Sequence, residues 1–126
     1  MKFEGSAKLL RIFLGESDRW RRQPLYVAIV EEMRKAGLGG ATVLKGVLGY
    51  GGQSVVHAAR VFDLSTDLPI IIEVVDAEDK VRAFLPALDA MMTEGLITME
   101  TVEVIAYRPG EPKERKQDAE GGMAVR

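Results

Sequence analysis

The order in which strand-like and helix-like patterns alternate is the feature that most constrains the fold of this chain. Strands place apolar residues at every second position, and helices place them three to four residues apart. These periods predict a strand at residues 8–14, a helix at 24–36, strands at 41–48 and 69–75, a helix between Asp76 and Gly95, and a strand at 101–107. The order β-α-β-β-α-β predicts an α+β, ferredoxin-like fold, with a four-stranded antiparallel sheet and both helices on one face.

The ends of the predicted helices carry recognisable signals. Pro24 suits a first helical position, where its missing N–H costs nothing. Asp76 suits the N-cap of the second helix, with Asp79 as its capping-box partner. Pro86 should kink that helix, because the carbonyl of Arg82 loses its donor.

Length and composition limit the possible functions. The 126 residues predict one domain at 6–107, followed by a mobile tail at 108–126 that is rich in Pro, Gly, Lys and Glu. The net charge of −2 gives no general attraction for nucleic acid, and the absence of cysteine excludes disulfides and thiolate zinc sites. Residues 1–6 have no apolar signal core, so we expect a cytoplasmic protein.

Two of the predicted strands are apolar on both faces, which two helices on one side cannot cover. In the first strand Leu9 and Phe13 lie on one face, and Leu10 and Ile12 lie on the other. In the third strand Ile71 lies on the face opposite to that of Ile70 and Ile72. A large apolar side chain left in water forfeits about 1.5–3 kcal/mol. We therefore predict a homo-oligomer packed sheet to sheet. The alternative is that the long loop or the C-terminal tail covers this face.

The glycine-rich segment at residues 45–53 is the most informative candidate site. Glycines let backbone N–H groups form anion-binding concavities, and Lys45 adds a positive charge. Gly46 within a strand pattern indicates a bulge or a close backbone approach. The segment opens a connection at 49–67 that is long enough to be functional, as a hairpin extension or a short helix. The alternative is a glycine-rich bend without a ligand.

Other candidates for chemistry are weaker. His57 is the only histidine, and no acid follows Ser54 and His57 at a spacing typical of a triad. Asp67 fits a turn, and Glu73 fits an ion pair within its strand. No paired acid and base emerges, so we expect no enzyme.

A basic cluster with an aromatic residue lies at residues 19–22, where Arg19, Arg21 and Arg22 surround Trp20. The strands offer Ile, Val and Leu where an RNA-binding sheet needs stacking aromatics, so we expect no nucleic-acid binding. The cluster fits a solvated loop or an anion contact at the neighbouring helix N-terminus.

Several short motifs are distinctive when taken together. They are residues 11–18 (RIFLGESD), 39–46 (GGATVLKG), 49–51 (GYG), 67–69 (DLP) and 94–98 (EGLIT). They resemble the domain-of-unknown-function 190 family, over about residues 6–107, and that family is similar to the PII-like signalling superfamily. The resemblance implies a homotrimer of ferredoxin-like domains, a mobile loop after the second strand and an adenine nucleotide bound between subunits. A membrane channel or transporter is the implied partner.

The correspondence with PII signalling proteins is partial. Their second strand ends in Gly-Phe-Gly-Arg-Gln, to which residues 49–53 are similar, but their phosphate-binding Gly-Asp-Gly-Lys loop is replaced by residues 94–98. This departure favours AMP, ADP or a cyclic nucleotide at least as much as ATP. The nucleotide-binding residues that the resemblance implies are Thr42, Lys45, Gly46, Gly49, Tyr50, Gly51, Gln53 and Arg108. The alternative function is a trimeric divalent-cation-binding protein of the cation-tolerance type, which shares the fold.

Overall fold

The computed structural model describes residues 5–50, 56–58 and 67–110. Along this part of the chain the elements are β1 (Gly5–Gly15), β2 (Arg19–Trp20), β3 (Gln23–Pro24), α1 (Leu25–Lys35), β4 (Thr42–Lys45), β5 (Leu48–Tyr50), β6 (Val56–Ala58), β7 (Pro69–Asp76), α2 (Glu78–Met91) and β8 (Leu96–Val104). The four longer strands and both helices follow the predicted order.

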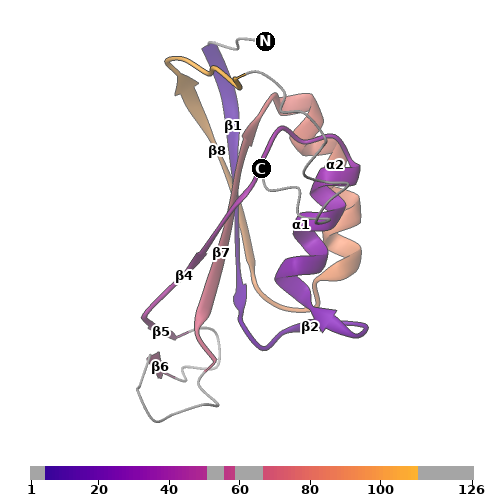
Figure 1. Cartoon of the computed structure of the whole chain (residues 1–126), viewed down its shortest axis with the longest axis vertical. Helices are drawn as coiled ribbons and strands as arrows, with labels where there is room; N and C mark the ends of the chain where they lie inside the picture. The colour runs from indigo at the N-terminus through magenta and orange to yellow at the C-terminus, as the bar shows by residue number, and fades with distance from the viewer. Residues whose placement is uncertain (1–4, 51–55, 59–66, 111–126) are drawn as a thin grey trace, which may run out of the picture.

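The main sheet has the order β4-β7-β1-β8, with every neighbouring pair antiparallel, and α1 and α2 lie together on one face (Figure 1). The ferredoxin-like α+β fold predicted from the sequence is therefore confirmed. Because β1 and β4 both run antiparallel to β7, they run parallel to each other. The connections that follow β1 and β4 therefore leave the sheet at the same end. Neither helix in the described part of the chain is long and apolar enough to cross a membrane.

The core lies between the sheet and the two helices. Alternate residues of β1 and β7 face the helices, and Leu10, Ile12 and Ile72 are completely buried there. The helices contribute Ile29, Met33, Val81, Phe84 and Leu88 to the same cluster. No polar side chain of the described residues is buried in it. We call this side of the sheet the helix face and the other side the open face.

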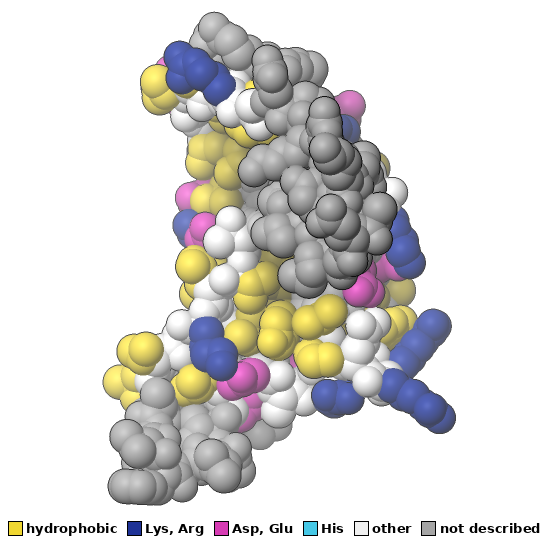
Figure 2. Space-filling model, viewed as in Figure 1, with side chains coloured by type: hydrophobic (Ala, Val, Ile, Leu, Met, Phe, Trp, Pro, Cys, Tyr) yellow, Lys and Arg dark blue, Asp and Glu magenta, His cyan; other side chains and the backbone are white. Residues whose placement is uncertain are grey.

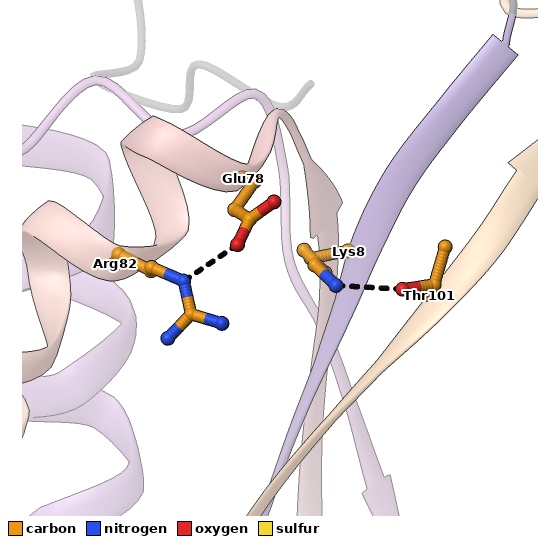
Figure 3. Close-up of polar contacts among 4 residues, drawn as sticks. All are labelled: Lys8, Glu78, Arg82 and Thr101. Carbon is orange, nitrogen blue, oxygen red and sulfur yellow. Dashed lines mark hydrogen bonds and ion pairs between the residues drawn. The ribbon is translucent and has the colours of Figure 1, made fainter.

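Polar groups close the rim of the helix face near the start of α2 (Figure 3). Lys8 Nζ donates a 2.6 Å hydrogen bond to Thr101 Oγ1, between β1 and β8. Arg82 Nε donates one of 2.7 Å to Glu78 Oε2, one turn earlier in the helix. The helix continues through Pro86 to Met91.

Three predictions about element ends are wrong. The strand predicted at 41–48 is β4, which ends at Lys45, because the chain turns at Gly46 and Leu48 already belongs to β5. The last strand is Leu96–Val104 and not 101–107, because β8 pairs with β1 along almost its whole length. Asp76 belongs to β7 and is not the cap of α2, which begins after Ala77 without a side-chain cap. The Asp76 carboxylate instead accepts hydrogen bonds from the N–H groups of Gly39, at 2.8 Å, and Ala77, at 2.7 Å.

The connections also contain strands that the sequence did not specify. Residues 19–24 form a short hairpin, in which the two-residue strands β2 and β3 pair, where we expected an irregular connection. β5 pairs with β6, so the described part of the 49–67 connection is a hairpin extension and not a helix. Gly51, Gly52, Gln53 and the tail from residue 111 lie outside the described residues.

Candidate functional site

The turn between β4 and β5 is shaped by the ring of Pro69. We call residues 45–50 the loop foot, because they carry the chain into the extension. Gly46 donates a 2.8 Å hydrogen bond from its N–H to the carbonyl of Pro69, and a Cβ at Gly46 would lie 2.7 Å from Pro69 Cγ. A Cβ at Gly49 would lie 3.0 Å from the same Pro69 Cγ. The close approach predicted at Gly46 is confirmed, and both glycines have a packing reason of their own.

Lys45, the basic residue of the loop foot, is already paired. Its Nζ lies 2.8 Å from Glu16 Oε2 in the turn after β1. This hydrogen bond raises the pKa of Lys45 above its ordinary value. An anionic ligand would therefore have to share Lys45 with Glu16 or displace the Glu16 carboxylate from it.

The turn after β1 also holds the chain where it returns from the extension. Glu16 donates its N–H to the Leu68 carbonyl, and Ser17 donates its N–H to Asp67 Oδ1, both at 2.8 Å. Residues 15–18 therefore contact both ends of the extension. We call this arrangement, together with the Lys45–Glu16 pair, the turn clasp.

The predicted nucleotide-binding residues fall into two groups. Thr42, Lys45, Gly46, Gly49 and Tyr50 follow one another along β4 and the loop foot, with the side chain of Tyr50 72% exposed. Gly51 and Gln53 lie outside the described residues. Arg108 is exposed beyond the end of β8.

Arg108 cannot reach the loop foot within one chain. Val104 pairs with Gly5, whereas Lys45 pairs with Ile70, which in turn pairs with Leu14. Leu14 lies nine residues after Gly5 along β1, which corresponds to about 30 Å at about 3.3 Å per residue. The four residues from Val104 to Arg108 span at most about 14 Å. The structure therefore places Arg108 at the opposite end of the sheet from Lys45 (Figure 1).

The open face combines apolar and charged rows. One row across all four strands is apolar and consists of Leu44, Ile71, Phe13 and Leu96. The next row consists of Thr42, Glu73, Arg11 and Thr98. Leu44 and Leu96 are 45% and 56% exposed, Phe13 and Ile71 are half-buried, and Leu9 is buried.

An ion pair lies in the middle of this face. Arg11 Nε is 2.8 Å from Glu73 Oε2, and both side chains are about one-third exposed, at 34% and 31%. The hydrogen bond to Glu73 raises the pKa of Arg11. The pairing of Glu73 agrees with its interpretation as an ion-pair residue.

A cavity away from the loop foot was not predicted. A cavity of about 330 Å³ lies between the β2–β3 hairpin and the end of α2, and it is lined by Ser17, Asp18, Arg19, Trp20, Leu25, Met91, Thr93 and Glu94. The sequence singled out the arginines, but it gave no signal that joins them to Thr93 and Glu94. In the described part of the chain, no three His, Asp or Glu side chains lie close enough to hold a metal ion.

Comparison with protein families places the chain. The family model DUF190, described as "Uncharacterized ACR, COG1993", matches residues 7–104. The chain belongs to this family. A UPF0166 protein of Aquifex aeolicus (strain VF5) is 39% identical over 98 residues, which cover 78% of this chain and 92% of the relative. A UPF0166 protein of Methanocaldococcus jannaschii is 40% identical over 92 residues, which cover 72% and 84%.

Solved structures give the same fold at low identity. A PII-like protein of Thermus thermophilus aligns with a TM-score of 0.59 at 19% identity, covering 80% of this chain and 91% of that one. CPII of Thiomonas intermedia, a nitrogen regulatory PII-like protein bound to ADP, AMP and bicarbonate, aligns at 0.55 and 18%, covering 82% and 91%. CutA of Synechococcus elongatus aligns at 0.55 and 11%, covering 86% and 87%. The fold of this DUF190 protein is thus PII-like.

Proposed function

We propose that this DUF190 protein is a PII-like regulator that binds an adenine nucleotide between the subunits of a homotrimer and signals through the 49–67 loop. The observation that carries the proposal is the separation of Arg108 from the loop foot. These candidate residues are too far apart to serve one ligand in a single chain. They can serve one between subunits if Arg108 of one copy lies beside Lys45 of the next.

The open face supports the homotrimer. Both described helices lie on the other face of the sheet, away from its apolar row and its central Arg11–Glu73 pair. A sheet face of this kind is typical of an interface between subunits. Packing one sheet against another would remove the exposed parts of Leu44 and Leu96 from water.

The choice of ligand rests on the fold neighbour and on the turn before β8. CPII is bound to ADP and AMP. Residues 94–98 replace the phosphate-binding loop of PII proteins, and Arg108 is a single arginine. Fewer groups for phosphate favour AMP, ADP or a cyclic nucleotide at least as much as ATP.

The turn clasp supplies a route from ligand to loop. A phosphate that takes Lys45 from Glu16 removes the ion pair that joins residues 15–18 to the loop foot. The ligand then has a different affinity for the clasped and the released loop, which a switch requires. The loop would present one of two shapes to its partner, for which a membrane channel or transporter is our candidate. In this scheme the cytoplasmic protein acts by binding, not by catalysis.

Thermal-shift measurements with AMP, ADP, ATP and cyclic AMP test the nucleotide. A ligand present at 100 times its Kd adds about 2.7 kcal/mol to the free energy of unfolding. We expect a shift with at least one nucleotide, a smaller shift for Lys45→Ala, and an unchanged shift for the control Lys80→Ala in the first turn of α2. A protein that responds to no nucleotide contradicts the proposal, as does a monomer in light scattering.

The second candidate is divalent-cation binding of the cation-tolerance type, which the fold shared with CutA keeps open. It predicts a shift with divalent cations and none with nucleotides. The same screen with added divalent salts therefore separates the two functions. Removal of the cation with a chelator would reverse the shift.

A further inference from the structure

The β2–β3 hairpin concentrates positive charge that no described carboxylate pairs. Arg19, Arg21 and Arg22 are all exposed, and in the described part of the chain none of them forms an ion pair. The net charge of the chain is −2, so this positive cluster is opposite in sign to the chain as a whole. Figure 2 shows dark-blue side chains projecting at the lower corner of the molecule, where Figure 1 places β2.

Two of these side chains have contacts within the hairpin. The Arg21 guanidinium lies 5.0 Å from the centroid of the Trp20 ring, and Arg19 Nη2 donates a 3.0 Å hydrogen bond to the Arg22 carbonyl. Arg21 has φ +58°, a left-handed conformation that favours glycine. An arginine is therefore present at a turn position where glycine would cost less. Strained positions of this kind are often functional.

The hairpin and the loop foot lie at the same end of the sheet. The hairpin follows β1 and the loop foot follows β4, and these two strands run parallel. The loop foot exposes Val47, Leu48 and Tyr50 to 74%, 63% and 72%. This end of the molecule therefore carries arginines at one corner and apolar and aromatic side chains at another (Figures 1 and 2).

Three of the described carboxylates at this end accept hydrogen bonds. Glu16 is paired with Lys45, and Asp67 accepts the N–H of Ser17. Asp18 accepts the N–H of Gly15 at 3.0 Å. Glu94, beside the cavity, remains exposed. Among the described residues no carboxylate forms an ion pair with the three arginines, although Asp18 and Glu94 line the cavity beside Arg19.

We propose that this end of the molecule docks on an anionic lipid surface, with the arginines on the lipid phosphates and the loop foot at the interface. Exposed arginine beside apolar and aromatic side chains is the composition of peripheral membrane-binding surfaces. Guanidinium groups bind phosphate through two hydrogen bonds. The arginines lie in the β2–β3 hairpin and the apolar side chains in the loop foot, at separate corners of this end, so a flat partner that reaches both fits better than a single peptide strand.

The proposed homotrimer would strengthen this docking, and in this respect the inference rests on the proposed function. Copies related by a threefold axis place equivalent points in one plane perpendicular to that axis. Three hairpins would then meet a flat bilayer together, and the second and third contacts would be intramolecular. The anionic surface would hold the 49–67 loop close to a partner in the membrane.

Sedimentation with phosphatidylcholine vesicles, with and without phosphatidylglycerol, tests the proposal. We expect the full chain to bind only the anionic vesicles, and to bind them less as salt rises. Each arginine near such a surface contributes about a fivefold gain in partitioning. The variant Arg19→Gln/Arg21→Gln/Arg22→Gln should therefore lose about 100-fold or more. The matched control Arg34→Gln/Lys35→Gln/Lys80→Gln removes three charges near the other ends of α1 and α2 and should bind like the parent.

Three results would overturn the docking: no binding to anionic vesicles, an equal loss in the control, or binding to polyglutamate without binding to vesicles. The last result would assign the arginines to an acidic protein. Thermal unfolding of each variant verifies that it is folded. Light scattering separates the two proposals, since a monomer that still binds anionic vesicles through its arginines contradicts the homotrimer and supports the docking.

Discussion

The two faces of the sheet differ in what completes them. On the helix face Leu10, Ile12 and Ile72 are fully buried by helices of the same chain. On the open face the same strands present Phe13 and Ile71 half-buried, together with the Arg11–Glu73 pair. Adjacent residues of β7 thus differ in burial although Ile70, Ile71 and Ile72 are chemically identical. Burial here is decided by topology and not by residue type.

The comparison indicates that the open face is built for a contact outside the chain. A face meant for water would carry polar residues at alternate positions, as in many antiparallel sheets. This face carries an apolar row across four strands. In the row beside it, Arg11 and Glu73 form an ion pair with each other. Variants that change one face only test this distinction.

Ile72→Ala should have the largest effect. Ile72 is completely buried, and truncation leaves a cavity under the helices. Such changes cost about 2–5 kcal/mol of the free energy of unfolding. Chemical denaturation of the variant measures the loss.

Ile71→Ala is the matched control on the open face. We expect it to reduce the stability of the single chain much less and to weaken self-association, which sedimentation equilibrium would detect. Equal losses of stability with unchanged association would mean that the two faces do not differ in the way that we infer.

Gly46→Ala should have the next largest effect. The added Cβ would lie 2.7 Å from Pro69 Cγ, at the end of β7 where the loop foot meets the sheet. Overpacking of this kind costs about 1–3 kcal/mol. Gly40→Ala is the control, because its Cβ would meet nothing within 4 Å. Thermal unfolding compares the two, and a similar change in both would show that the contact with Pro69 is unimportant.

The Arg11–Glu73 pair reports whether the open face is covered in solution. Arg11→Met leaves Glu73 without its partner, which matters little in water and much in an interface that excludes water. We expect Arg11→Met to weaken self-association, and the double variant Arg11→Met/Glu73→Met to recover part of it. If the single and the double variant associate equally, the pair lies outside any interface.

The sequence predicted the architecture because its apolar periods were clear. The strands at 8–14 and 69–75 and both helices were found close to their observed bounds. The predicted close approach at Gly46 follows from its place in a strand pattern. Local signals were sufficient wherever one segment determined its own conformation.

The sequence failed where a distant segment decides the outcome. The start of β8 is set by pairing with Phe13, more than 80 residues earlier, as the register Phe13↔Leu96 shows. Asp76 is of a residue type that often caps helices, but in the fold its carboxylate accepts a hydrogen bond from the backbone N–H of Gly39. The Lys45–Glu16 pair and the cavity beside Trp20 join segments that no short motif connects.

The smallest effect is expected at the rim of the helix face, where Glu78 accepts a hydrogen bond from Arg82 (Figure 3). This bond, with a further contribution from Lys8, lowers the pKa of Glu78 below its ordinary value of 4.5. A carboxylate with a lowered pKa stabilises the fold above its unfolded pKa, and this contribution is lost as the pH falls through the folded one. Glu78→Gln should therefore lower stability slightly near neutral pH and leave it almost unchanged in strong acid.

Denaturant unfolding from neutral pH to below pH 4 measures this difference, and Asp79→Asn controls for the removal of a first-turn carboxylate from α2. If Asp79→Asn changes the pH dependence as much as Glu78→Gln, the effect belongs to the helix N-terminus and not to Arg82. Because this pair lies outside the open face, neither variant should alter self-association. A change in association would mean that the interface extends to the helix rim, and the contrast between the two faces would then have to be redrawn.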